Sequence, residues 1–429
     1  MKKSGAVLIA VIFAQLAHGQ ISLNAGSPAE QKIGWAEAEI KANPDRSQPY
    51  NDLAVALVCR ARETADVHYY DQAETALRTS LQKSPGNLEG EKVRIMIFLG
   101  RHQYAQARES ASALNKKTPD DVLVYGLLAD ADIELGNYSE AEKSTQWMLD
   151  LRPGNVPGLL RAATLRRIFG DNEGSLDLYS QAYQQIPPTQ SEEIAWTLTQ
   201  MADLQFSAGH AKEAEDLAHS ALTKFPGYYP VLETSARIEA GRGHYSAAVD
   251  LLRRRNDNFP TAGSRYALAN ALQLAGERDK ADSEYRKFET AALADGSVNA
   301  ELISYYLGPG NNSAEALRLA EVEIARRHDI RTLDAYAWAL CENARYSEAK
   351  RQIDLALSTG VLDAEILYHA GVIAEKLRDG AASNSYLRRS LNLNPMSEVA
   401  GQAQEALGRL ASASFTSDDA HGLALGGTK

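Results

Sequence analysis

The sequence predicts an all-α protein built as a solenoid of paired helices, and three observations lead to this prediction. Apolar residues recur at helical spacing in pairs of neighbouring segments, as in residues 122–135 and 138–151. Pro153 and Pro187, each at the end of such a pair, lie 34 residues apart. Glycines stand between the two segments of five successive pairs, at Gly136, Gly170, Gly209, Gly243 and Gly276. A period of this length indicates units that stack into one continuous core.

The clearest unit spans residues 122–153 and reads VLVYGLLADADIELGNYSEAEKSTQWMLDLRP. Its glycine can take the left-handed conformation that ends the first helix, and its proline closes the second helix. This unit resembles a tetratricopeptide repeat, whose pattern is a bulky residue, Leu-Gly, Tyr, Ala, an aromatic and Pro over 34 residues. The resemblance implies a right-handed α-solenoid of about ten helix-turn-helix repeats with a capping helix at each end.

The two ends of the chain differ from the repeats. Residues 1–19 combine Lys2 and Lys3 with a short apolar run and Ala17-His18-Gly19, which is typical of a secretory signal peptide. We expect cleavage after Gly19, export to the periplasm or beyond, and no stable membrane insertion afterwards. Residues 20–46 are interpreted as a capping half-repeat, residues 396–411 as a C-terminal capping helix and residues 412–429 as a disordered tail.

Residues 47–395 are assigned to the repeat array, with two irregularities. The first repeat carries seven extra residues around residues 60–70, which we expect to project further than the other repeats. The rhythm weakens near residues 289–312, where Gly308-Pro309-Gly310 cannot continue a helix and should cut one short.

Composition excludes several function classes. The formal net charge of −11 provides no excess of Lys and Arg to neutralise phosphates, so we expect no nucleic-acid partner. Cys59 and Cys341 should lie too far apart in a solenoid to form a disulfide, and we interpret both as buried thiols. The zinc-protease, phosphate-loop and serine-hydrolase motifs are absent from the sequence, so we expect no catalytic site, no metal and no cofactor.

Three further stretches resemble a family of exported bacterial tetratricopeptide proteins. They are residues 59–64 with Tyr69 and Tyr70, residues 334–340, and residues 368–371. The resemblance covers nearly the whole mature chain. It implies the location and the architecture, and it implies no particular reaction.

A concave groove is the remaining place where such a protein can work. In the family, one stripe of each first helix lines this groove. The stripe includes Asp130, Ile133, Arg167, Asp203, Phe206, Glu233, Gln273, Glu301, Asp334, Glu365 and Glu375. Aromatic residues and Arg carry most interface energy. The candidate binding residues are Trp196, Arg237, Tyr266, Asn270, Tyr305, Arg331, Trp338 and Tyr368.

Packing against the neighbouring repeat is the alternative for each of these aromatic residues. Trp35 and Trp147 are expected in the core. The Lys and Asn clamp with which some related repeats grip a C-terminal carboxylate is absent, although Arg237 near Asn270 could accept an isolated acidic group.

The favoured hypothesis is a non-enzymatic scaffold or adaptor of the bacterial envelope, which binds a protein or peptide segment in the groove. A second hypothesis is an assembly subunit that forms oligomers through its convex face or through residues 60–70. A third is an accessory carbohydrate-binding module, because aromatic groove residues would also suit a sugar.

Overall fold

A computed structural model describes residues 26–295 and 299–424 of the chain. Helices are the only regular elements in these ranges: there are twenty-two of them and no β-strand. The predicted signal peptide at residues 1–19 lies outside the described residues. None of the helices in the described part combines the length and the apolarity that crossing a bilayer would need.

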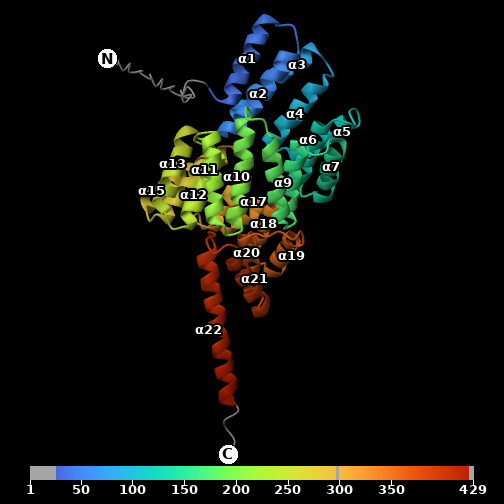
Figure 1. Ribbon diagram of the computed structural model, residues 1–429. Coiled ribbons are helices and arrows are strands. Elements are labelled where there is room, and N and C mark those ends of the chain that lie inside the picture. Colours follow the sequence, from blue (N-terminus) through green and yellow to red (C-terminus); the bar gives the residue numbers. More distant parts are fainter. Residues whose placement is uncertain (1–25, 296–298, 425–429) are drawn as a thin grey trace, which may run out of the picture.

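Ten helix hairpins follow one another between two single helices, as the repeat pattern predicts (Figure 1). The single helices are α1 (Pro28–Ala42) and α22 (Ala400–Ala424). The hairpins are α2 (Gln48–Thr64) with α3 (His68–Lys83), α4 (Leu88–Gly100) with α5 (Tyr104–Asn115), α6 (Val122–Leu135) with α7 (Tyr138–Leu151), α8 (Val156–Ile168) with α9 (Asn172–Gln185), α10 (Ser191–Ser207) with α11 (Ala211–Lys224), α12 (Tyr229–Gly241) with α13 (Tyr245–Asn258), α14 (Ala262–Leu274) with α15 (Arg278–Asp295), α16 (Asn299–Leu307) with α17 (Ser313–Ile324), α18 (Ile330–Glu342) with α19 (Tyr346–Leu357), and α20 (Ala364–Lys376) with α21 (Gly380–Leu393).

Local sequence explains why each hairpin forms. In the unit at residues 122–151, the Asp121 side chain accepts hydrogen bonds from the Leu123 and Val124 N–H groups and starts α6. Gly136 ends α6 with a φ of 81°, a conformation that costs other residues free energy. Alanines let the second helices approach their partners closely, because they are almost fully buried at the same place in seven of the hairpins: Ala107, Ala141, Ala214, Ala248, Ala281, Ala316 and Ala349.

The weakened stretch near residues 289–312 contains the shortest helix in the described residues. Helix α16 has nine residues, and the turn that contains Pro309 separates it from α17. Helix α16 ends at Leu307, directly before Gly308. Residues 296–298, within the same stretch, lie outside the described residues.

Three expectations need correction. The C-terminal cap and the tail are not separate, because α22 runs as a single helix to Ala424; residues 425–429 lie outside the described residues. Trp35 is 60% exposed and Trp147 is 45% exposed, so neither lies in the core. Trp147 instead packs beside Tyr125 near the surface, with their ring centroids 6.0 Å apart.

Helices α1 to α4 lie at one end of the molecule and α20 to α22 at the other (Figure 1). The middle of the superhelix nevertheless closes on its later part. The His328 N–H donates to the Leu135 carbonyl oxygen at 3.1 Å, and the Ile330 N–H donates to the Tyr138 hydroxyl at 2.8 Å. Repeats that are about 190 residues apart in sequence therefore touch, which a simple stack would not allow.

Two hairpin glycines lie at this closure. A Cβ atom on Gly136 would come within 2.5 Å of the His328 carbonyl carbon, and one on Gly170 within 2.1 Å of the Gly360 carbonyl oxygen. Glycine is needed here for a close backbone approach as well as for a positive φ. The five glycines in phase thus mark the hairpins, and two of them, Gly136 and Gly170, also permit the closure.

Candidate binding cavity

The closed superhelix surrounds a cavity of about 1510 Å³. First helices of the middle and late repeats form much of its wall, and loops at residues 65–67 and 394–399 complete it. Cavities for drug-sized ligands measure about 300–1,000 Å³, so this one has room for a larger occupant.

The predicted groove stripe accounts for much of the wall. Four of the candidate binding residues line the cavity: Arg237, Tyr266, Asn270 and Arg331. Further stripe residues line it as well: Arg167, Asp203, Phe206, Glu233, Glu301 and Glu365. Helical spacing placed these residues correctly, because each first helix presents the same face to the superhelix axis.

The other four candidate residues do not line the cavity. Tyr305 is only 9% exposed and packs in the core, where its ring lies 5.5 Å from that of Phe288, so its assignment to the groove is wrong. Trp196, Trp338 and Tyr368 are half-buried against neighbouring helices. Trp196 contacts Tyr179 edge-on, with the ring centroids 6.2 Å apart. Aromatic rings beside the groove fill the gaps between first helices, which the stripe alone does not predict.

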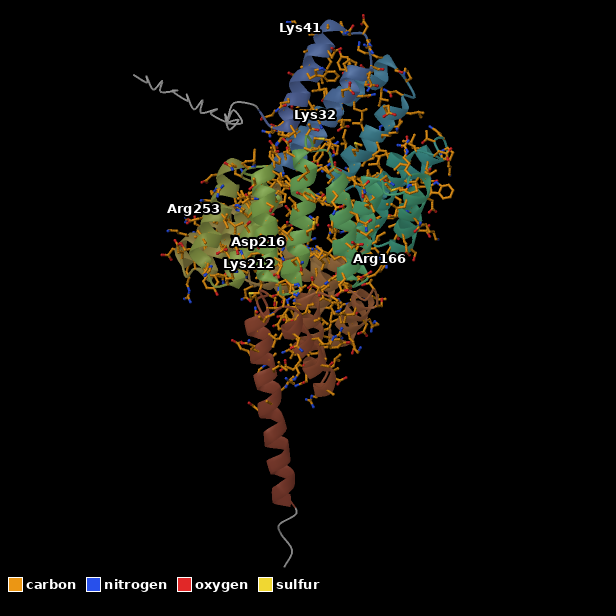
Figure 2. All side chains as sticks on the ribbon, in the orientation of Figure 1. Lys32, Lys41, Arg166, Lys212, Asp216 and Arg253 are labelled. Carbon is orange, nitrogen blue, oxygen red and sulfur yellow. The ribbon has the colours of Figure 1, made fainter. Side chains whose placement is uncertain are left out.

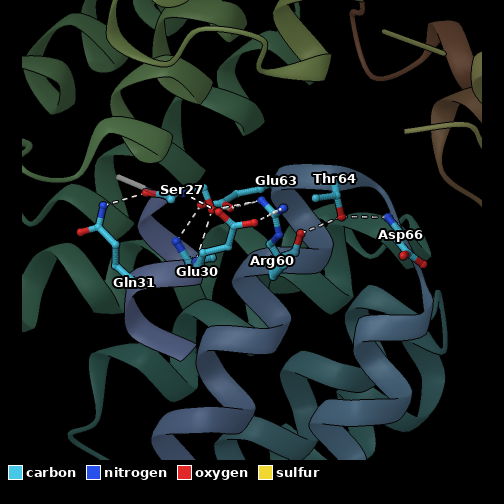
Figure 3. A network of polar contacts seen from close by, with 9 residues as sticks. Ser27, Glu30, Gln31, Arg60, Glu63, Thr64 and Asp66 are labelled. Atoms are coloured by element: carbon cyan, nitrogen blue, oxygen red, sulfur yellow. Dashed lines mark hydrogen bonds and ion pairs between the residues drawn. The ribbon is translucent and has the colours of Figure 1, made fainter. Parts of the chain in front are cut away.

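The insertion in the first repeat turns toward the cavity and does not project. Arg60 and Glu63 at the end of α2 hold Ser27 and Glu30 at the start of α1 (Figure 3). Asp66, whose N–H donates to the Thr64 hydroxyl in the same network, lines the cavity. The additional length of α2 thus brings the following loop to the cavity wall, which corrects the expected projection.

Contacts from the first repeat close this end of the cavity. Arg62 donates to Glu192 on α10 at 3.0 Å, and the Tyr228 hydroxyl donates to the same carboxylate at 3.0 Å. The Arg60 guanidinium lies 5.8 Å from the centre of the Phe259 ring. The composition of residues 60–70 gave no signal of these partners, because they lie more than 100 residues away in sequence.

Charges on the cavity wall are mixed. Arg237 donates to Asp203 at 3.1 Å, and the buried Arg255 lies 2.7 Å from Glu233. Enclosure by the surrounding protein raises the pKa of Glu365 to about 7, although its side chain opens into the cavity. Burial likewise raises the pKa of Tyr266 to about 12. The wall can therefore supply guanidinium and hydroxyl donors and carboxylate acceptors to an occupant.

A buried polar pair supports the wall behind Arg331 and Glu365. His369 on α20 lies 2.8 Å from Asp334 on α18, and Trp338 stacks on the imidazole with a centroid separation of 4.4 Å. Burial alone would lower the pKa of His369, but the Asp334 carboxylate raises it above its ordinary value. Asp334, placed in the groove by its spacing, is therefore a structural partner of His369.

The two thiols are not paired with each other, as predicted. Burial raises the pKa of Cys341 to about 12 and also raises that of Cys59, so neither is an activated nucleophile. Within residues 26–295 and 299–424, no three His, Cys, Asp or Glu side chains are gathered in a way that could hold a metal ion.

The repeat pattern and the ten hairpins together define the fold class: this is an all-α solenoid of paired helices. No family model matches the sequence, and no curated protein is significantly similar to it.

Several solved structures are similar to it, each at low sequence identity. The human IFIT1 dimer with m7Gppp-AAAA is 12% identical, with a TM-score of 0.49 over 86% of this chain and 96% of that one. TTC0263, a tetratricopeptide-repeat protein of Thermus thermophilus, is 20% identical, with a TM-score of 0.38 over 47% and 98%. The type IV pilus biogenesis factor PilW is 16% identical, with a TM-score of 0.41 over 52% and 99%. Similarity at this level concerns the fold alone.

Proposed function

We propose that this chain is a non-enzymatic scaffold of the bacterial envelope that holds a segment of a partner protein in its cavity. The observation that carries the proposal is the cavity itself, which is larger than the pocket of a small ligand and lined by both donors and acceptors. A polypeptide segment has the size and the mixed polarity to fill such a space. The signal-like residues 1–19 support an exported location.

Nucleic acid is a poor occupant. The cavity is lined by four arginines and by seven Asp and Glu side chains, so its wall carries an excess of negative charge. A nucleic-acid site needs the opposite balance.

Site-specific photo-crosslinking tests the location of the partner. A photoreactive residue at Tyr266 inside the cavity should crosslink one discrete protein in an envelope extract. The same residue at Tyr245, which is 38% exposed and does not line the cavity, is the control. Equal capture from both positions, or capture from Tyr245 alone, would contradict the proposal. Intact-mass spectrometry of the protein from its host tests export: a chain starting at Gln20 supports it, and a retained Met1 contradicts it.

Assembly through the outer surface is a second candidate, and the exposed Trp35 and Trp147 favour it. It predicts a particle size that rises with concentration in light scattering. A double replacement of both tryptophans by alanine should abolish this rise, and a constant monomer over a hundredfold concentration range would exclude such assembly.

A further inference from the structure

Three arginines from distant parts of the chain share the cavity. Arg167 lies on α8, Arg237 on α12 and Arg331 on the first turn of α18. Helix α18 reaches this position through the closure of the superhelix, where the Ile330 N–H donates to the Tyr138 hydroxyl at 2.8 Å. The group of guanidiniums therefore exists only in the closed form.

These arginines make few bonds to the rest of the protein. Arg237 shares Asp203 with Thr234, at 3.1 and 3.0 Å. Arg167 makes one long hydrogen bond, 3.5 Å to the Ser207 hydroxyl. Within the described ranges, the Arg331 guanidinium has no hydrogen-bond or ion-pair partner. Three positive charges thus have one directly bonded carboxylate between them.

Arg167 is the least exposed of the three, whereas Arg237 and Arg331 are open to the cavity. Like charges repel more strongly when protein replaces the surrounding water. Burial lowers the pKa of Arg167, and the neighbouring Arg331 and Arg237 lower it further, against the attraction of Asp203. A charged group with a perturbed pKa in a cavity often belongs to a ligand-binding site.

The outward-facing neighbour of Arg167 shows the contrast. Arg166 has a side chain that is 60% exposed and pairs with Asp171 at 3.2 Å, on the outside of the molecule (Figure 2). Of these two adjacent arginines on one helix, Arg167 faces the cavity and Arg166 faces outward. Arg166 is therefore a matched control for Arg167.

We propose that Arg167 and Arg331, with Arg237 beside them, bind a carboxylate of the polypeptide segment that occupies the cavity. This inference rests on the function proposed above. The planar guanidinium donates two parallel hydrogen bonds that match a carboxylate. The remaining wall carries Glu233, Glu301, Asp363, Glu365 and Glu398, which would repel a chain of phosphates but accept a segment with one acidic group.

A titration with acetate tests the anion site without any knowledge of the partner. At constant ionic strength, acetate should raise the thermal midpoint of the full chain by about 1–2 °C. The rise should disappear in Arg331→Gln and Arg167→Gln and persist in Arg166→Gln. Without acetate, Arg331→Gln should be no less stable than the wild type, because repulsion is relieved. Equal acetate effects in all four proteins would overturn the anion site.

A displayed library of random twelve-residue peptides tests the polypeptide part. Selected peptides should be enriched in Asp or Glu, and Arg331→Gln should weaken their binding at least about tenfold, whereas Arg166→Gln should not. The carboxylate can come from an acidic side chain or from the C-terminus of the peptide. Binding that is lost when the side chain is replaced by its amide identifies the first source, and binding that is lost on amidation of the C-terminus identifies the second.

The two experiments separate the possible failures. Peptides that bind in the cavity but bind Arg331→Gln equally well would overturn the arginine site and leave the scaffold function standing. An acetate effect that needs both arginines, without any selected peptide, would keep the anion site and overturn the polypeptide ligand.

Discussion

Gly170 is the residue at which local and long-range constraints meet most clearly. Its φ is 77°, and a Cβ would fall 2.1 Å from the Gly360 carbonyl oxygen. Gly243 has a φ of 80°, but a Cβ there would meet open space. Gly170→Ala should therefore destabilise the protein by about 3 kcal/mol or more, whereas Gly243→Ala should cost about 1 kcal/mol. Urea unfolding measures the free energy of unfolding of both variants. Equal losses would show that the contact between Gly170 and Gly360 contributes nothing to stability.

His369 gives the protein a pH dependence with a defined sign. Its pKa is raised in the fold by Asp334, with Glu365 and Asp363 also nearby, in spite of its burial against Trp338. A group with a raised pKa adds stability below its unfolded pKa, and this stability is lost as pH rises through the folded pKa.

The stability gap between the wild type and His369→Gln should consequently be larger at pH 5.5 than at pH 8. Denaturant unfolding at both pH values measures the gap. A gap that stays constant, or that grows toward pH 8, would contradict the assignment of Asp334 as the partner.

Helix α16 shows how an element can depend on one side chain. It has nine residues and follows the weakest part of the repeat pattern, yet Tyr305 and Tyr306 are both buried in the core. Tyr305→Ala should cost about 3–4 kcal/mol, since it leaves a cavity beside Phe288. Arg237→Ala, at a site open to the cavity, should cost less than about 1 kcal/mol. Thermal or urea unfolding measures the stability of both variants. Comparable losses of stability would contradict the core position of Tyr305.

Contacts between distant repeats determine the shape of the whole molecule. Arg327 lies 3.3 Å from Glu134 and 3.4 Å from Asp329, and its guanidinium is 5.5 Å from the centre of the Tyr104 ring. These contacts hold the closure around the cavity, because they join α5 and α6 to the turn before α18.

Arg327→Ala should open this closure. We expect a larger radius of gyration in small-angle X-ray scattering and a loss of about 2 kcal/mol. The adjacent Arg326 is 54% exposed and pairs only with Glu323 in the described part of the chain, so Arg326→Ala is the control. An unchanged radius of gyration in Arg327→Ala would contradict this role of Arg327 and would mean that the contacts of Gly136 and Gly170 suffice for the closure.

Helix hairpins, their turns and the face that most first helices present to the axis follow from the amino-acid sequence alone. These features depend on residues within about one repeat of each other: helical spacing, a glycine with positive φ, and a proline that ends a unit. Arg237, Tyr266, Asn270 and Arg331 could therefore be placed on the cavity wall in advance.

Which repeats meet depends on the path of the whole superhelix. The position of α18 beside α6 and α7 results from small rotations added over many repeats, and a local pattern does not record their sum. For this reason the inward turn of residues 65–67 and the presence of Arg167 and Arg331 on one cavity wall could not be predicted. Tyr305 packs against Phe288 of the preceding helix, an alternative that helical spacing alone left open. The hairpins follow from short-range chemistry, and the cavity follows from the way in which the superhelix closes.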